Sequence, residues 1–281
     1  MSTVMGCGLP RTGTSLVFQL LRHTPGVTTS PVKEWHYWDR LCKQQGNWQD
    51  DSLSLYPPGD VLTHNIKNPS SRFYIREGRL RRQFFRLAHD SAQMPKATSA
   101  LERFAELMSL FDVGDFTPSN CLLTETQWKE IIGAIPKIKV VISVRNPINQ
   151  VWSAFCNQQK KTNRPVNLDE LKKYVARPGG GVAKADFEKI LGALRSAGLT
   201  QQRLLIIEYD KLVNDIEGAA EQLRKFMCVD SSGIGKFDFQ RFHSAKSSSL
   251  PLYSEAMTLL EDLLLPRLDT ARNLTGFDLK L

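Results

Sequence analysis

The sequence predicts an α/β fold in which helices flank a central parallel sheet. Three short apolar segments, at residues 3–8, 138–144 and 203–208, have the length and composition of buried strands, and helical periodicity follows each of them. The second segment, IKVVISV, is β-branched and almost unbroken, which is typical of a parallel strand buried on both faces. Because strands alternate with helices along the chain, we expect the strands to pair in parallel.

The helices are expected directly after these strands. An apolar stripe at helical spacing covers residues 14–22, immediately beyond the first strand and a short turn. Pro147 suits the first turn of a helix after the second strand, because proline fixes the backbone angle that a helix start requires. A helix over 216–226 follows the third strand, and a last helix is expected over 252–265.

A long region over 33–135 separates the first two strands. Within it, residues 76–87 (REGRLRRQFFRL) present an apolar face and an arginine face at helical spacing. The arginine face is either a solvated helix surface or a patch for an anionic ligand. Residues 177–181 (RPGGG) predict a flexible break, either a plain connector or a loop at the mouth of a site.

Length, charge and cysteine content limit the class of protein. The 281 residues and the apolar fraction of 41% suit one large core, so we expect a single domain over 1–281. The net charge of +8 favours an anionic partner without choosing among nucleotides, nucleic acid, sulfated glycans and membrane surfaces. The five cysteines are scattered and contain no C-x-x-C pair, which favours a reducing compartment and no structural zinc site.

No membrane span or secretory leader is expected. The sequence has no run of about 18 apolar residues, and its start lacks the charge and apolar pattern of a signal peptide. We therefore expect a cytoplasmic, soluble protein, with a trimmed luminal domain as the alternative. The sequence does not predict an oligomeric state.

Residues 8–15 (GLPRTGTS) form the central motif, between the first predicted strand and the first predicted helix. The spacing is that of a phosphate-binding P-loop, but Thr14 stands where a nucleoside triphosphatase has its lysine. Glycines allow successive N–H groups to surround a phosphate, and the helix start adds its positive dipole end. Arg11 is the one long cation of this loop. The loop therefore suits a terminal phosphate that carries a transferable group.

Residues 10–15 (PRTGTS) resemble the 5′-phosphosulfate loop of sulfotransferases that use 3′-phosphoadenosine 5′-phosphosulfate (PAPS), P-[KR]-[ST]-G-T-[ST]. The resemblance implies the P-loop-like sulfotransferase fold. It also implies that Arg11 faces the oxygen bridging phosphate and sulfate. The 5′-phosphate is then held by the residues that follow, which makes the candidate donor-binding loop Arg11, Thr12, Gly13, Thr14 and Ser15.

A second anion site is expected at the end of the middle strand. Residues 145–153 (RNPINQVWS) resemble the element of the same family that binds the 3′-phosphate, R-[ND]-P-x-x-x-x-x-S. Arg145 and Ser153 match its two phosphate ligands. Ligands in open α/β sheets collect at the carboxyl ends of the strands, which is where both motifs are expected.

Residues 33–39 (KEWHYWD) resemble the acceptor-side segment of heparan-type and many bacterial sulfotransferases. The resemblance implies that Glu34 is the base that takes the acceptor proton. His36 is the competing base, because its ordinary pKa lies nearer neutrality, or else a structural histidine. The aromatic residues at 35, 37 and 38 could line an acceptor pocket or pack in the core.

Two further segments depart from the family pattern. Residues 115–120 (DFTPSN) occupy the place of E-K-T-P-S-Y, with Phe116 in place of the lysine, and Lys33 or Lys67 is the candidate to compensate for that loss. Residues 243–249 (HSAKSSS) occupy the place of a basic glycine-containing loop that closes over the 3′-phosphate. Lys246 is a candidate contact to the donor there, and a mobile polar linker is the alternative.

The resulting hypothesis is an enzyme that transfers the sulfuryl group of PAPS directly to a hydroxyl or amine, leaving 3′,5′-ADP. Arg11, Glu34 and His36 are the candidate catalytic residues, and no metal is expected. The acceptor, a small molecule or a glycan, is not identified by the sequence, and no nucleic-acid partner is expected. The alternatives are a P-loop kinase of a small metabolite, which would need ATP and Mg²⁺, and a non-catalytic basic module that binds anions or nucleotides.

Overall fold

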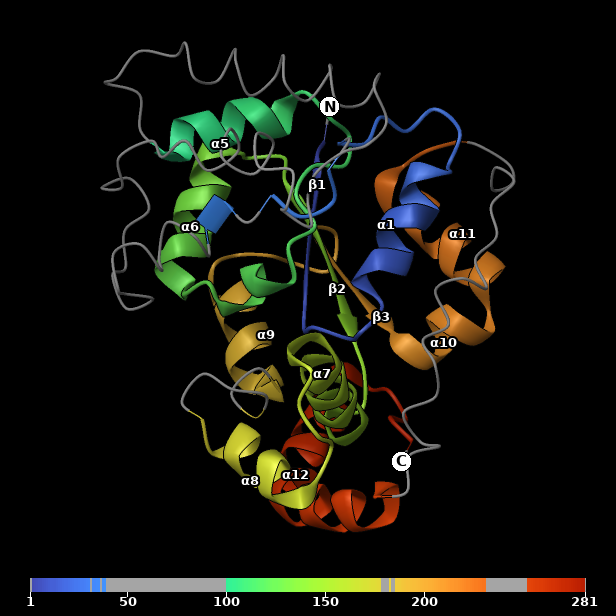
Figure 1. Cartoon of the computed structure of the whole chain (residues 1–281). Helices are drawn as coiled ribbons and strands as arrows, with labels where there is room; N and C mark the ends of the chain where they lie inside the picture. Colours follow the sequence, from blue (N-terminus) through green and yellow to red (C-terminus); the bar gives the residue numbers. More distant parts are fainter. Residues whose placement is uncertain are drawn as a thin grey trace.

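A three-stranded parallel sheet lies at the centre of the protein (Figure 1). Its strands are β1 (Val4–Gly8), β2 (Lys139–Val144) and β3 (Leu204–Glu208), in the order β1-β2-β3. The register places Gly8 opposite Ser143, so the ends of β1 and β2 lie side by side. The expected α/β fold class and the three strands are confirmed, each strand starting one residue later than expected.

The computed structural model describes most of the chain outside the long region after the first helix. The described residues are 2–30, 32–35, 37–38, 100–177, 182, 185–230 and 252–280. The predicted helix over 76–87 and almost all of the loop over 177–181 lie outside them.

One face of the sheet is covered by α1 (Thr14–Arg22) and α11 (Ile216–Met227), with α10 (Tyr209–Asn214) beside them (Figure 1). Alternate strand residues face these helices, as the two-residue period of a strand requires. Val4, Val141 and Ile207 belong to one buried apolar cluster with the leucines of α1 and α11. The helix predicted over 14–22 has the predicted bounds.

The opposite face packs against a larger apolar cluster. Met5, Val140 and Ile142 contribute to it from the sheet. The surrounding helices are α5 (Ala100–Ser109), α6 (Glu125–Ala134), α7 (Pro147–Thr162), α8 (Leu168–Ala176), α9 (Phe187–Ser196) and α12 (Tyr253–Thr275). Helices therefore cover both faces, as a parallel sheet needs.

The segment over 112–116 runs alongside β1. Val4 N–H donates to Asp112 O at 2.8 Å, and Gly6 N–H donates to Asp115 O at 2.8 Å. Val113 in turn forms isolated bridges with both Val4 and Thr29. The 3₁₀ turn η1 (Pro118–Leu122) follows. This arrangement brings the chain after α1 to the edge of the sheet, although the two segments are far apart in the sequence.

Helix α7 starts as expected. Asn146 caps it, because its Oδ1 accepts hydrogen bonds from the N–H of Ile148 at 2.8 Å and of Asn149 at 3.3 Å. Pro147 occupies the first turn, where the missing N–H leaves no intrahelical bond unmade. The cap fixes the direction in which α7 leaves the end of β2.

The last helix is longer than the sequence predicts. We expected it to end at 265, before Pro266, but α12 continues through that proline to Thr275. Proline removes the hydrogen bond to the carbonyl four residues earlier, at Asp262. Asp262 and Pro266 both lie on the exposed side, so water can solvate that carbonyl, while Leu268 and Ala271 continue the buried stripe.

Candidate functional site

The loop between β1 and α1 turns through two residues with left-handed backbone angles. Arg11 and Gly13 both adopt left-handed angles, with φ of 75° and 89°. Gly13 caps α1 without a side-chain hydrogen bond, so no cap side chain satisfies the first N–H groups of the helix. A Cβ atom at Gly13 would lie 2.8 Å from Leu212 Cδ2. The position therefore requires glycine for its conformation and for its packing.

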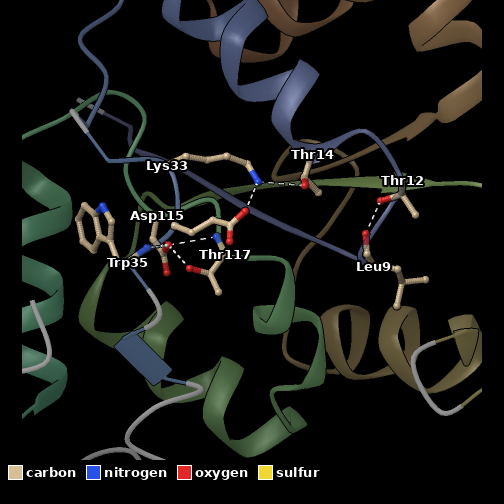
Figure 2. A network of polar contacts seen from close by, with 8 residues as sticks. Leu9, Thr12, Thr14, Lys33, Trp35, Asp115 and Thr117 are labelled. Atoms are coloured by element: carbon tan, nitrogen blue, oxygen red, sulfur yellow. Dashed lines mark hydrogen bonds and ion pairs between the residues drawn. The ribbon is translucent and has the colours of Figure 1, made fainter. Parts of the chain in front are cut away.

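Thr12 holds the loop from inside. Its side chain is fully buried, and its hydroxyl donates to Leu9 O at 2.8 Å (Figure 2). The same hydroxyl is 2.9 Å from Ser143 Oγ, which ties the loop to the end of β2. The Thr12 N–H also donates to Leu9 O, at 3.3 Å. These contacts shape the loop and leave the Thr12 side chain turned away from solvent.

The structure brings the two predicted anion motifs into contact. Arg11 Nε donates a hydrogen bond to Ser153 Oγ at 3.1 Å, and Arg145 Nη1 donates to the carbonyl of Arg11 at 3.2 Å. Each bond joins the loop after β1 to the segment after β2. Arg11, Arg145 and Ser153 therefore form one polar cluster at the carboxyl ends of two neighbouring strands, where ligands of open α/β sheets bind.

Arg145 sits against the start of α10. Its guanidinium lies over the Tyr209 ring, 4.4 Å from the centroid. Burial is the main cause that lowers the pKa of Arg145 from its ordinary value, against the opposing influence of Tyr209 and Asp210. A half-buried arginine remains cationic at neutral pH even so. The stacking holds the guanidinium plane in one orientation beside the loop.

The acceptor-side segment places a charged pair against the loop. Lys33 Nζ forms an ion pair with Glu34 Oε1 at 2.6 Å and donates to Thr14 Oγ1 at 3.2 Å. Figure 2 shows the Lys33 ammonium directed at Thr14, in the first turn of α1. Glu34, the candidate base, is thus linked through one ammonium group to the candidate donor-binding loop.

Asp115 organises this segment from a fully buried position. Its Oδ1 accepts from Trp35 N–H at 3.0 Å, Thr117 N–H at 3.0 Å and Thr117 Oγ1 at 2.6 Å (Figure 2). Its Oδ2 accepts from Asn120 Nδ2 at 3.0 Å. One carboxylate therefore fixes both the backbone next to Glu34 and the start of η1.

The aromatic residues of the acceptor-side segment pack in the core. Trp35 and Tyr37 are 2% exposed and Trp38 is fully buried, and all three contact the Phe104 ring. Of the two alternatives that the sequence left open, core packing describes these three side chains. Phe116, at the place of the family lysine, is also buried and contacts Phe18.

Three of the sequence candidates lie outside the described residues: His36, Lys67 and Lys246. The described candidates, Arg11 to Ser15, Glu34, Arg145 and Ser153, all lie around the loop. Sequence reasoning gave no site role to Ser143, Tyr209 or Asp115. The sequence held a signal for two of them: Ser143 lies near the end of a buried strand beside the loop, and Asp115 opens the segment that occupies the place of E-K-T-P-S-Y.

Neither a metal cluster nor a membrane span is found in the part of the chain that the structure describes. Among those residues, no group of three or more His, Cys, Asp or Glu side chains could hold a metal ion. None of the described helices is long and apolar enough to cross a membrane.

Comparison with known families gives the class of this protein. A family model described as "Sulfotransferase family" matches residues 3–231, which include both anion motifs and the acceptor-side segment. The chain therefore belongs to the sulfotransferase family, and sulfuryl transfer is its general activity. Sequence comparison with curated proteins finds no match.

Solved bacterial structures share the fold at low sequence identity. A sulfotransferase from Alicyclobacillus acidocaldarius aligns with a TM-score of 0.54 and 15% identity, over 99% of this chain and 97% of its own. The sulfotransferase domain from the curacin biosynthetic pathway aligns with a TM-score of 0.54 and 15% identity, over 99% of both chains. The sulfotransferase domain from the Synechococcus PCC 7002 olefin synthase aligns with a TM-score of 0.52 and 15% identity, over 100% of this chain and 96% of its own. At this identity the likeness concerns the fold alone.

Proposed function

We propose that this protein transfers the sulfuryl group of PAPS to a hydroxyl or amine of a small-molecule or glycan acceptor. The observation that carries the proposal is the contact between the two anion motifs, in which Arg11 bonds Ser153 and Arg145 bonds the Arg11 carbonyl. A donor with a 5′-phosphosulfate and a 3′-phosphate needs two cationic sites close together, and a donor with a single phosphate group does not.

The residues of the loop fit such a donor. Gly8 and Gly13 let the loop turn while packed closely against its neighbours, since an added Cβ would lie 2.8 Å from Thr14 Cγ2 at Gly8 and 2.8 Å from Leu212 Cδ2 at Gly13. In the proposal, the N–H groups of Gly13, Thr14 and Ser15 hold the 5′-phosphate at the helix start. Thr12 shapes the loop through its buried hydroxyl.

Arg145 and Ser153 are the proposed ligands of the 3′-phosphate. Arginine offers a planar pair of donors that matches a phosphate, and a hydroxyl adds a neutral donor. When bound, the donor supplies an electrophilic sulfur and a phosphate leaving group. Arg11 offsets the negative charge that develops on the departing oxygen, through preorganised charge in a partly buried site.

Glu34 is the proposed base that removes the acceptor proton. The carboxylate is held at the edge of the loop by Lys33 and by the backbone anchor that Asp115 provides at Trp35. Holding acceptor, base and leaving group in fixed positions supplies most of the rate gain, because sulfuryl transfer needs little covalent assistance. His36 remains the competing base.

Nucleotide preference tests the proposal directly. Thermal unfolding is measured with 3′,5′-ADP, ATP with Mg²⁺, and 5′-AMP at equal concentrations. A ligand at about one hundred times its Kd stabilises a fold by about 2.7 kcal/mol, so 3′,5′-ADP should shift Tm far more than the other two. Equal shifts for 3′,5′-ADP and ATP would contradict the proposal and favour the kinase alternative. Release of 3′,5′-ADP from PAPS in the presence of acceptor pools then identifies the acceptor class.

A further inference from the structure

Lys33 occupies the space between the candidate base and the candidate donor-binding loop. Its Nζ lies 2.6 Å from Glu34 Oε1 and 3.2 Å from Thr14 Oγ1 (Figure 2). Thr14 stands at the P-loop position that carries a lysine in nucleoside triphosphatases. The loop itself contains no lysine. Lys33, 19 positions after Thr14 in the chain, places its ammonium at the same helix turn.

The backbone around Lys33 is fixed on both sides. The Lys33 carbonyl accepts a hydrogen bond from Phe116 N–H at 2.8 Å, and the Trp35 N–H donates to the buried Asp115 carboxylate at 3.0 Å. The Trp35 indole is itself buried, with its Nε1 donating to Ser30 Oγ at 2.9 Å. Because these anchors flank Lys33 closely, its side chain extends toward the loop from a rigid base.

The side chain opposite Lys33 cannot supply that charge. Phe116 is 1% exposed, and its ring lies so close to Gly6 that a Cβ there would approach the ring to 2.1 Å. Lys33 and Phe116 are joined through their backbones, so Lys33 lies beside the position at which the family pattern has its lysine.

We propose that Lys33 is a catalytic residue whose ammonium contacts the oxygens of the sulfuryl group during transfer. The proposal rests on the proposed use of PAPS. In the transfer, a bond forms between the acceptor oxygen or nitrogen and sulfur. The bond between sulfur and the bridging oxygen breaks, and its electron pair stays with the phosphate. The acceptor proton goes to Glu34, and Lys33 remains protonated throughout.

A purely structural role for the Lys33–Glu34 pair would give a different result. The Lys33 and Glu34 side chains are 16% and 22% exposed, and partly exposed ion pairs contribute only about 0–1 kcal/mol to stability. The chain offers a matched control, because Lys129 Nζ pairs with Glu125 Oε1 at the same 2.6 Å on the outer surface of α6. Lys33→Met and Lys129→Met each remove one ammonium from a close ion pair. Of these two ammonium groups, only that of Lys33 borders the loop.

The experiment measures acceptor-independent hydrolysis of PAPS, which needs no knowledge of the acceptor, together with calorimetric binding of 3′,5′-ADP. Lys33→Met should slow hydrolysis by about 10²–10³-fold, the usual loss for one electrostatic donor to a developing charge. Its affinity for 3′,5′-ADP, which carries no sulfuryl group, should stay within threefold of wild type. Lys33→Arg should restore at least a tenth of the rate, and Lys129→Met should leave the rate unchanged.

A second comparison separates direct action from action through Glu34. Lys33→Met is also made in a Glu34→Gln background, where it should slow hydrolysis further if the ammonium contacts the sulfuryl group. A double variant no slower than Glu34→Gln, or a Lys33→Met enzyme at the wild-type rate, would overturn the inference. Lys33→Gln provides the same readings if the methionine variant does not fold. Failure of the wild-type protein to bind 3′,5′-ADP would instead overturn the proposed function.

Discussion

The Nε atom of Arg11 donates a hydrogen bond to the Oγ atom of Ser153 at 3.1 Å, across 142 positions of sequence. Arg11 belongs to the loop after β1, and Ser153 lies on the second turn of α7, after β2. The contact exists because β1 and β2 are parallel neighbours, which brings the segments that follow them to the same edge of the sheet. A substitution in one motif should therefore disturb the side chains of the other.

Arg145→Ala should weaken the binding of 3′,5′-ADP by roughly 1.5–3 kcal/mol, because a charge-assisted contact to phosphate is lost. Isothermal titration calorimetry measures the change. Arg164→Ala, at an exposed position beyond the end of α7, serves as the control for net charge and should bind normally. Unchanged affinity in the Arg145 variant would remove this residue from the site.

Glu34→Gln keeps the shape of the side chain and removes its proton-accepting charge. Turnover with PAPS and an identified acceptor should fall by about 10²–10⁴-fold, the usual range for a general base, while affinity for 3′,5′-ADP changes little. His36→Asn should lower turnover less than Glu34→Gln does. If Glu34→Gln keeps near-normal turnover and His36→Asn is inactive, the histidine is the base.

Asp115→Asn should destabilise the fold, because an amide cannot accept from all the groups that the carboxylate contacts. Asn120 Nδ2 would meet another N–H donor, and a buried unsatisfied polar group costs about 1–3 kcal/mol. Asp112→Asn is the matched control: Asp112 accepts from Thr28 N–H and Oγ1 at an exposed position. Urea unfolding should show a larger loss for Asp115→Asn, and equal losses would contradict the role assigned to Asp115.

Gly13→Ala should lower both stability and nucleotide binding. A left-handed alanine costs about 1–2 kcal/mol by itself, and the added Cβ would also press on Leu212. Gly26 has a similar φ of 79° with no atom within 4 Å of an added Cβ, so Gly26→Ala measures the conformational cost alone. Thermal unfolding with and without 3′,5′-ADP should show a ligand-dependent loss only for Gly13→Ala.

Alkylation of Cys156 should depend steeply on pH. Burial is the main cause that raises the pKa of this thiol to about 11, and the nearby Arg11 only partly opposes it. Because the thiolate is the nucleophile, the rate with iodoacetamide should rise about tenfold per pH unit from pH 8 toward pH 11. Peptide-resolved mass spectrometry follows the modification. A rate that levels off by pH 9 would contradict the raised pKa.

The parts of the fold that local sequence determines were predicted well. The strand at 138–144 and the helix at 14–22 were predicted from their local apolar patterns, and the observed bounds agree within one residue. The grouping of Arg11 with Arg145 and Ser153 was expected from motif order, and the structure places these side chains together. Motifs that follow neighbouring parallel strands meet for a topological reason, which sequence order alone can indicate.

The remaining features depend on contacts that no local pattern contains. Asp115 acts on Trp35 across 80 positions, and its role follows from the pairing of 112–116 with β1. The predicted end of the last helix, at residue 265, was wrong, because the helix does not stop at Pro266. Its exposed position and the buried Leu268 beyond it make continuation more favourable, which only the packing of α12 reveals.

The contact between Gly6 and the Phe116 ring has an evolutionary consequence. Any side chain at position 6 would collide with this ring, which lies 2.1 Å from the site of an added Cβ. A lysine at 116, with its flexible stem, could bend away from an alanine at position 6, but a buried phenyl ring cannot. Aligned relatives should therefore have glycine at position 6 wherever residue 116 is aromatic. Where residue 116 is lysine, position 6 should also accept other small residues. The two positions should change together during divergence of the family.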